Sequence, residues 1–259
     1  MAITCYQIAD LLRTAVGASP THRCTTAIVV AAGSSTRMGG EVSKQLLDVA
    51  GIPVLARTLA AYEQAATVDE IVLVARREDF DAFLALAKQY HITKLKRITE
   101  GGESRQASVL HGLEVVSDKT KFVAIADGAR CLVTPEMIDK VNLNAWQKGA
   151  ACAGTKTTDT VKLVAPGDYA EYIAPDRETV WLAQTPQTFS LPLYRAAAYH
   201  AKEKGYTATD DAALVTAIGR PVKLVDCGKD NIKITTPSDL YLARAILARR
   251  EETDKEDNV

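Results

Sequence analysis

The sequence lacks three features that would each indicate a particular class of protein: an excess of one charge, a cysteine framework and a long apolar run. The formal net charge of the 259 residues is −1, so no basic surface points to nucleic acid. The five cysteines are scattered and form no CxxC pair, which favours free thiols in a reducing cytoplasm over disulfides or a zinc site. No apolar run approaches the roughly 20 residues that span a bilayer. We therefore expect a cytoplasmic globular protein without nucleic-acid or membrane partners.

Two common phosphate-binding motifs are also absent, although the chain has a place for one. Residues 27–32 are apolar and rich in β-branched side chains, which is typical of a buried parallel strand, and Gly33 follows them. Counted from that glycine, GxxxxGK[ST] requires glycine and lysine where the chain has Met38 and Gly39. GxGxxG requires glycines where the chain has Ser35 and Met38. Neither motif fits this loop.

The loop nevertheless carries two cations, Arg37 and Lys44, close to its glycines. The backbone N–H groups of a glycine loop can point at an anion, and small residues let the anion approach closely. A pair of cations can hold a triphosphate and stabilise the charge that develops when a group is transferred. The loop therefore predicts a nucleotide-phosphate site, with a solvated loop and incidental charges as the alternative.

Apolar runs alternate with amphipathic segments over most of the remaining chain. We expect further strands at residues 71–75, 95–98, 122–126, 150–154 and 222–225. We expect helices at residues 53–65, 79–90, 135–148, 191–204, 209–218 and 236–250, and one more between Gly102 and residue 116. This alternation predicts an α/β fold with a three-layer, Rossmann-like, mostly parallel sheet and helices on both of its faces.

Three segments depart from that pattern. Residues 155–183 alternate polar and apolar side chains between turn signals, which predicts a projecting β-arm outside the parallel core. An arm that cannot bury itself needs a partner. Residues 1–24 form an N-terminal extension, for which a short helix packed on the domain, a disordered leader and an early translation start are the alternatives. Residues 251–259 are expected to be a disordered, solvated tail.

Asp127 follows the apolar run at residues 122–126, at the carboxyl end of an expected central strand. Open α/β sheets bind their ligands at such strand ends. Mg²⁺ prefers one or two carboxylates together with substrate phosphates. Asp127 is therefore our candidate for a metal and phosphate site, and an aspartate that only caps the turn is the alternative.

Two further segments suggest ligand contacts, each with a plain structural alternative. Gly101 and Gly102 could let backbone approach a planar base, but the segment by itself favours a turn capped by Ser104. Lys233 lies between apolar neighbours, so on a strand it would point away from them, either into a cleft or into solvent. Thr209 would serve as the N-cap of the helix that follows it.

Taken together, the motifs resemble those of the sugar-phosphate nucleotidylyltransferases. The stretch AAGSSTRMGGEVSKQ has spacing most similar to the 2-C-methyl-D-erythritol 4-phosphate cytidylyltransferase family. GG-x-x-R-x-x-SV, D-x-AR, DT-x-K, TPQ, TD and NIK-x-T follow in the family order across residues 25–248. The chain departs from the family pattern His-Asp-Ala-Ala-Arg-Pro at Ala126, Gly128 and Cys131, which affects fine substrate choice more than the chemistry.

The resemblance implies a cytidylyltransferase domain at residues 25–250 that transfers CMP from CTP to 2-C-methyl-D-erythritol 4-phosphate and releases diphosphate, in the non-mevalonate route to isoprenoid precursors. It implies Mg²⁺ or another divalent cation near Asp127 and a homodimer formed through the arm. The catalytic residues that it implies are Arg37, Lys44, Arg177 and Lys233. The nucleotide contacts that it implies are Ala31, Ala32, Gly33, Gly101, Gly102, Ser108 and Gly128, with Arg105 as a further candidate. The acceptor contacts that it implies are Asp127, Arg130, Thr160, Thr185 and Thr209.

Related functions remain open at this point. The same fold could transfer cytidylyl to ribitol 5-phosphate, or a nucleotide to a molybdenum cofactor. A non-catalytic protein that binds sugar nucleotides is a further alternative, against which the intact cations at the four catalytic positions argue. No histidine lies near a motif except His111, on a helix flank, so the sequence suggests direct transfer without a covalent nucleophile.

Overall fold

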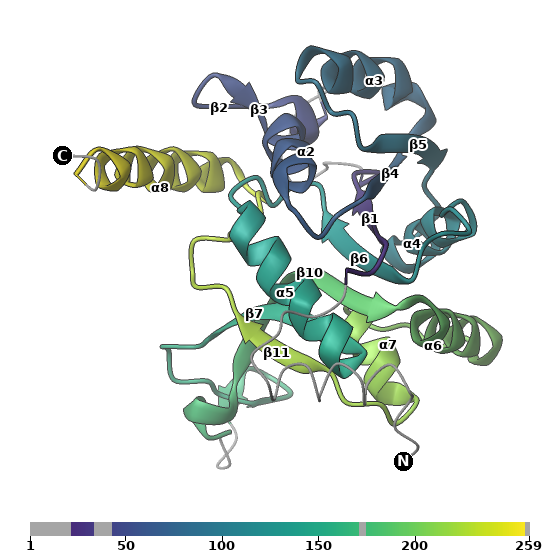
Figure 1. Ribbon diagram of the computed structural model, residues 1–259. Coiled ribbons are helices and arrows are strands. Elements are labelled where there is room, and N and C mark those ends of the chain that lie inside the picture. Colours follow the sequence, from purple (N-terminus) through teal and green to yellow (C-terminus); the bar gives the residue numbers. More distant parts are fainter. Residues whose placement is uncertain (1–21, 34–42, 171–174, 257–259) are drawn as a thin grey trace, which may run out of the picture.

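The computed structural model describes residues 22–33, 43–170 and 175–256, and a seven-stranded sheet lies at its centre (Figure 1). The strand order is β11-β7-β10-β6-β1-β4-β5. The strands are β1 (Thr25–Val30), β4 (Glu70–Ala75), β5 (Leu95–Glu100), β6 (Phe122–Asp127), β7 (Ala150–Lys156), β10 (Trp181–Ser190) and β11 (Lys223–Asp226). Only β10 runs antiparallel to its neighbours β6 and β7. The mostly parallel sheet confirms the fold class predicted from the sequence.

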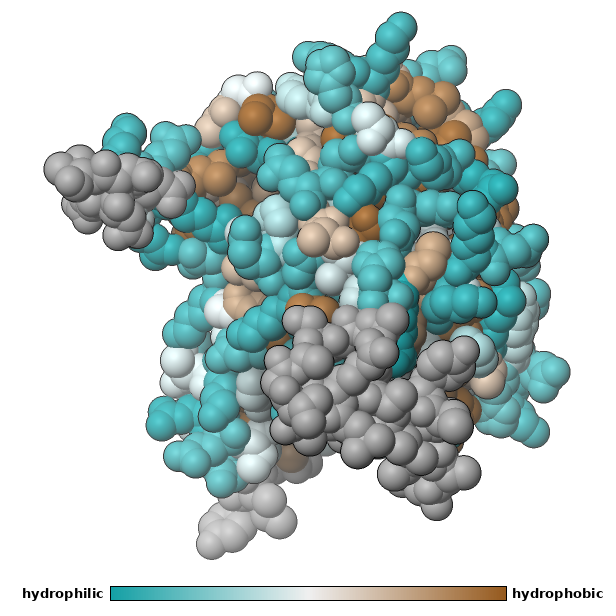
Figure 2. Space-filling model, viewed as in Figure 1, coloured by the Kyte–Doolittle hydropathy of each residue, from teal (hydrophilic) through white to brown (hydrophobic). Residues whose placement is uncertain are grey.

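Helices cover both faces of the sheet. They are α2 (Val54–Gln64), α3 (Phe80–Gln89), α4 (Arg105–Glu114), α5 (Pro135–Lys148), α6 (Leu191–Lys204), α7 (Asp211–Ala217) and α8 (Pro237–Glu256). Because side chains alternate along a strand, Val29 of β1 packs with α2, α3 and α5, whereas Ile28 packs with α4, α6 and α7. The result is the expected three-layer arrangement. The face of the molecule in Figure 2 is mainly hydrophilic, with small apolar patches.

Local sequence explains where several helices begin and end. Thr134 caps α5 by accepting a hydrogen bond from Met137 N–H, Pro135 occupies the first turn, and Gly149 ends the helix with φ of 87°. In α4, Ser104 accepts a hydrogen bond from Ala107 N–H, so the capping role suggested for Ser104 is confirmed. α7 is capped by Asp210, which accepts from Ala213 N–H, and not by Thr209 as the sequence suggested.

Strand β10 was not predicted, although it lies near the middle of the sheet. Its TPQ segment contains a proline, and proline cannot donate to a strand ladder. The structure accommodates Pro186 where the register between β10 and β7 shifts, between Ala183 and Gln187. Such a bulge is one of the few places within a sheet that tolerate proline. The same irregularity brings Thr185 beside the end of β6.

The middle of the segment expected to form an arm lies outside the central sheet, whereas residues 155–156 and 181–183 at its two ends belong to β7 and β10 and pair with each other. β8 (Val164–Ala165) and β9 (Tyr169–Ala170) pair antiparallel as a separate two-stranded sheet beyond the ends of β7 and β10. Leu163, Val164 and Tyr169 are 47%, 62% and 75% exposed, so the arm presents apolar side chains to solvent. A second small ladder joins β2 (Asp48–Val49) to β3 (Ile52–Pro53), between the first loop and α2.

Two expectations near the carboxyl terminus were wrong. α8 continues to Glu256 and extends away from the body (Figure 1), so residues 251–256 are helical where a disordered tail was expected. Glutamate and lysine are good helix formers, and extending an existing helix avoids a new nucleation step. The segment that carries Lys233 is not a strand, although the strand argument for its orientation assumed one.

Candidate active site

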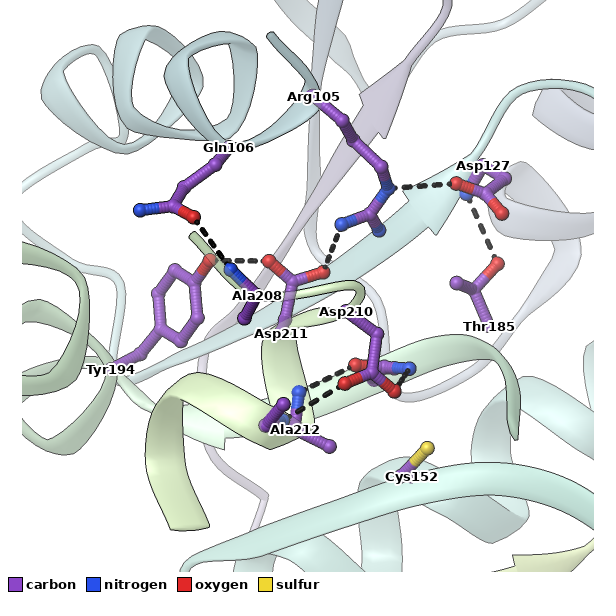
Figure 3. A network of polar contacts seen from close by, with 12 residues as sticks. Arg105, Gln106, Asp127, Cys152, Thr185, Tyr194, Ala208, Asp210, Asp211 and Ala212 are labelled. Atoms are coloured by element: carbon purple, nitrogen blue, oxygen red, sulfur yellow. Dashed lines mark hydrogen bonds and ion pairs between the residues drawn. The ribbon is translucent and has the colours of Figure 1, made fainter. Parts of the chain in front are cut away.

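The candidate site lies at the carboxyl end of β6, where Asp127 is the last residue of the strand. Asp127 is buried, and its backbone N–H donates a 3.0 Å hydrogen bond to Thr185 Oγ1 of β10. β6 therefore presents its terminal carboxylate beside the bulge of the antiparallel strand (Figure 3). This is the strand end at which the sequence placed a ligand site.

Three cations surround the Asp127 carboxylate. Arg105 Nε lies 3.2 Å from Oδ1, while Lys233 Nζ and Arg130 Nε lie 3.0 and 3.5 Å from Oδ2. Burial raises the pKa of Asp127, but the charges of Arg105, Lys233 and Arg130 outweigh burial and lower that pKa to about 2. Asp127 is therefore ionised at neutral pH, and the cluster around it carries an excess of positive charge.

The loop before α8 is fixed against the turn after β6. Ile234 is fully buried, and its N–H donates to the carbonyl of Ala129 at 2.8 Å. Arg130 Nη1 donates to the carbonyl of Asn231 at 2.7 Å. These two contacts direct Lys233 toward Asp127 although the segment is not a strand. Its role as a phosphate or acceptor ligand stays a prediction.

Asn231 connects this loop to the bulge of β10. It is fully buried, and its Nδ2 donates to Gln184 Oε1 at 3.1 Å and to the carbonyl of Thr185 at 2.9 Å. The sequence reasoning did not single out Asn231 or Gln184. The motif NIK-x-T contained the signal, because an asparagine close to the buried Ile234 must find partners for its amide.

Close backbone packing explains the glycines on the nucleotide side of the site. A Cβ on Gly101 would lie 2.3 Å from Ala32 Cβ, and one on Gly102 would lie 2.6 Å from Ala107 Cβ. The Gly102 N–H donates a 3.0 Å hydrogen bond to Ser108 Oγ, which fixes the glycine pair beside the first turns of α4. These contacts within the protein account for both glycines, and their contact with a base stays a prediction.

The described residues on either side of the first loop approach the same strand end. A Cβ on Gly128 would lie 3.1 Å from the carbonyl of Val30 and 3.2 Å from Gln45 Oε1. Ala31, Ala32 and Gly33 continue from β1, and Ala31 N–H donates to the carbonyl of Val74. Lys44 begins the 3₁₀ helix η2 (Lys44–Leu46), whereas Arg37 lies outside the described residues.

Three predicted residues lie on other parts of the surface. Thr160 and Arg177 are exposed on the arm, where Arg177 begins η4 (Arg177–Thr179) and its Nη1 donates to the carbonyl of Thr158. Thr209 is exposed just before α7. The structure of one chain does not bring these three residues into contact with Asp127, so their roles stay predictions.

Asp211 is a buried residue of the site that the sequence reasoning missed. It follows the capping Asp210, and its Oδ2 lies 2.7 Å from Arg105 Nη1 (Figure 3). Arg105 therefore contacts both Asp127 and Asp211. The signal was the pair of aspartates at the start of a helix, since one is enough to cap it and the other needs a further partner.

The described residues contain no cluster of three or more histidine, cysteine, aspartate or glutamate side chains that could hold a metal. Asp127 offers one carboxylate, and cations already face both of its oxygens. Mg²⁺ is commonly held by one or two carboxylates with substrate phosphates and water. The site therefore suits a cation carried mainly by the substrate's phosphates, and it does not provide a cage made of protein alone.

An open, mostly parallel sheet with a glycine loop after its first strand and a cation cluster at its carboxyl edge defines a Rossmann-like nucleotidyltransferase. The family model for 2-C-methyl-D-erythritol 4-phosphate cytidylyltransferase matches residues 25–249. The chain belongs to this family.

Individual relatives agree with that assignment. The chain is 44% identical over 225 residues to the 2-C-methyl-D-erythritol 4-phosphate cytidylyltransferase of Desulforamulus reducens, covering 86% of this chain and 96% of the relative. It is 42% identical over 224 residues to that of Geobacillus kaustophilus, covering 86% and 97%. The resemblance to this family that the sequence motifs carry is thereby confirmed.

Solved structures show the same fold. The 4-diphosphocytidyl-2C-methyl-D-erythritol synthase of Anaerococcus prevotii superimposes with a TM-score of 0.79 at 29% identity, covering 88% of this chain and 97% of that one. The 2-C-methyl-D-erythritol 4-phosphate cytidylyltransferase of Thermus thermophilus superimposes with a TM-score of 0.68 at 34% identity, covering 85% and 97%.

Proposed function

We propose that this protein transfers CMP from CTP to 2-C-methyl-D-erythritol 4-phosphate and releases diphosphate, in the non-mevalonate route to isoprenoid precursors. The observation that carries the proposal is the cluster of Arg105, Arg130 and Lys233 around Asp127, in a chain that is 44% identical to a cytidylyltransferase for this acceptor.

The proposed chemistry is an in-line attack of the acceptor's phosphate on the α-phosphorus of CTP. Two anions must meet, so repulsion between them is a large part of the barrier, and fixed cations lower it. The Lys233 side chain is 37% exposed, so it can reach a phosphate, whereas the Arg130 side chain is 13% exposed and holds the loop. Lys233 and Arg177 position the acceptor, and Arg37 and Lys44 stabilise the transition state and the leaving diphosphate.

Further contacts are proposed from the match to the family motifs. On the nucleotide side they are Ala31, Ala32, Gly33, Gly101, Gly102, Ser108 and Gly128. On the acceptor side they are Asp127, Arg130, Thr160, Thr185 and Thr209. A divalent cation such as Mg²⁺, when bound, neutralises charge on the triphosphate. Asp127 is the residue that would hold it, together with the phosphates.

We further propose that the arm forms a homodimer and carries Thr160 and Arg177 into the neighbouring subunit's site. The exposure of Leu163, Val164 and Tyr169 supports this, because a two-stranded ladder with apolar faces is marginal without a partner. We place the protein in the cytoplasm, which the free thiols among the described cysteines support. No described helix has the length and apolar character needed to cross a membrane.

The test is diphosphate release by the purified protein with CTP and Mg²⁺, and with 2-C-methyl-D-erythritol 4-phosphate, ribitol 5-phosphate or no acceptor in separate reactions. We expect release only with the first acceptor. Lys44→Ala should lower kcat by at least about 100-fold, the scale for losing one charge-stabilising donor. Lys88→Ala, on the exposed face of α3, is the matched control. Release with ribitol 5-phosphate alone, or with neither acceptor, contradicts the proposal.

A further inference from the structure

Arg105 lies between two buried carboxylates that come from different parts of the fold (Figure 3). It is the first residue of α4; its Nε lies 3.2 Å from Asp127 Oδ1 of β6, and its Nη1 lies 2.7 Å from Asp211 Oδ2 of α7. Each end of the planar guanidinium thus faces a different carboxylate. This geometry needs arginine, because a lysine ammonium is a single point charge that cannot span both partners.

Asp211 is itself held in one orientation. Its Oδ1 accepts a 2.5 Å hydrogen bond from the hydroxyl of Tyr194, whose ring stacks on Phe189 with centroids 5.1 Å apart. Tyr194 is buried, and burial followed by the charge of Asp211 raises its pKa well above the ordinary value, so the hydroxyl remains a donor. Since Asp210 already caps α7, capping does not explain the buried charge of Asp211.

The cations of Asp127 divide between its two oxygens. Lys233 and Arg130 both face Oδ2, whereas Arg105 is the one cation that the described residues place against Oδ1. In the proposed reaction Lys233 turns to the acceptor's phosphate, and Asp127 then loses its closest counter-ion on the Oδ2 side. Burial lowers the pKa of Arg105, but Asp211 and Asp127 outweigh burial and raise it, so Arg105 stays charged throughout. Arg105 cannot follow Lys233, because Asp211 binds its other end.

We propose that Arg105 is a positioning residue that holds the Asp127 carboxylate in place while Lys233 moves from it to the acceptor's phosphate, and that Asp211 and Tyr194 fix Arg105 for this task. The proposal rests on the proposed function, since it assigns a role within that reaction. It predicts that turnover depends on a residue of α7 that touches neither substrate.

The first test compares kcat and KM for both substrates in Arg105→Lys, Asp211→Asn and the double variant. We expect each single change to lower kcat about 10-fold or more, because misplacing a catalytic group by an ångström can cost up to about 100-fold. We expect KM for CTP to change less than about twofold. Because Asp211 acts through Arg105, the double variant should lose no more than Arg105→Lys alone. Asp81→Asn, an exposed carboxylate on α3, is the control for charge removal.

Tyr194→Phe keeps the proposal testable if the charge changes prevent folding, since it removes one hydroxyl and keeps the stacked ring. We expect it to lower kcat about two- to fivefold, as one hydrogen bond to a charged group is weakened. A kcat within twofold of wild type in every folded variant, or losses that multiply in the double variant, would overturn the proposal, because Asp211 would then be structural only.

A second measurement does not depend on activity. The Nε–H of Arg105, held against Asp127, should give a slowly exchanging NMR signal that Arg105→Lys identifies by its loss. We expect Asp211→Asn to accelerate exchange of this proton at least about 10-fold, since a freed side chain opens more often. Unchanged exchange overturns the proposal. A wild-type protein without turnover contradicts the proposed function instead, and the NMR result then decides the inference.

Discussion

At the scale of single residues, the main feature of the site is that the Asp127 carboxylate is both buried and charged. Three cations compensate one buried carboxylate, and a fourth charged group, Asp211, compensates one of those cations. A buried charge is tolerated only when it is paired. Removing one partner leaves a buried charge unpaired, which costs free energy of folding. The residues of this cluster therefore depend on each other for stability as well as for chemistry.

This dependence predicts how stability changes with pH. The pKa of Asp127 is about 2 in the folded protein and about 4 in an unfolded chain, so pairing stabilises the fold fully above pH 4. That stabilisation, on the order of 2 kcal/mol, is lost as the pH falls through 2. In urea unfolding, the difference in stability between wild type and Asp127→Asn should therefore be largest at neutral pH and shrink between pH 4 and 2.

Asp81→Asn is the control for this pH series, because Asp81 is exposed on α3. Its difference from wild type should be small at each pH. If the difference for Asp127→Asn stayed constant across the acid range, Asp127 would not be the paired carboxylate that the structure shows.

At the scale of elements, α4 connects the sheet to the site. Gly112 lies in its interior, where glycine usually disfavours a helix by about 1 kcal/mol relative to alanine. The contact with the sheet explains the glycine: a Cβ there would lie 2.5 Å from Ile28 Cγ2 and 2.9 Å from Val74 Cγ2. α4 can therefore lie close to β1 and β4 and bring Arg105 and Ser108 to the strand ends.

Gly112→Ala should accordingly destabilise the protein despite the better helix propensity of alanine. Overpacking of a filled core costs about 1–3 kcal/mol, which exceeds the gain in propensity. Because α4 would move from the sheet, we also expect kcat to fall several-fold while the circular dichroism spectrum stays native. Glu114→Ala, at the exposed end of the same helix, should change neither. A more stable Gly112→Ala protein would show that the contact can relax without cost.

The elements also show which parts of the structure the sequence could predict. Periodicity located most strands and helices because each depends on local burial, and it placed Asp127 at its strand end. It missed β10, whose proline is accommodated where the register between β10 and β7 shifts. It also missed the pairing of Arg105 with Asp211, because that contact joins the starts of two helices that are distant in the chain. Tertiary packing decides both features.

At the scale of the whole molecule, the arm separates Arg177 and Thr160 from the cluster around Asp127. Both residues are exposed, and Arg177 binds only the carbonyl of Thr158 among the side-chain contacts found in the described residues. The same arm exposes apolar side chains that include Val164 and Tyr169. Both features agree with the proposed homodimer, in which a second copy of the chain covers the arm and receives Arg177 in its own site.

Mixing two inactive variants tests this arrangement directly. Lys44→Ala removes a cation at the first loop and Arg177→Ala removes one on the arm, and each alone should lower kcat by about 100-fold. If a site takes Lys44 from one subunit and Arg177 from the other, a mixed dimer contains one site with both residues and one site with neither. Refolding an equal mixture makes about half of the dimers mixed, so about a quarter of wild-type activity should return.

If both residues served the same subunit, every site in the mixture would carry one defect, and no activity would return. In the control, Leu84→Glu is added to both inactive variants. Leu84 is an exposed apolar residue of α3 outside the arm, so this change should leave the dimer intact in sedimentation velocity. Adding Val164→Glu and Tyr169→Glu to both variants should instead give monomers and abolish the recovery, because buried charges at the arm would oppose association. If a quarter of wild-type activity returns in the mixture and is lost with these arm changes, Arg177 acts in the neighbouring subunit's site. Only a site built from both subunits can then contain Lys44 and Arg177 together.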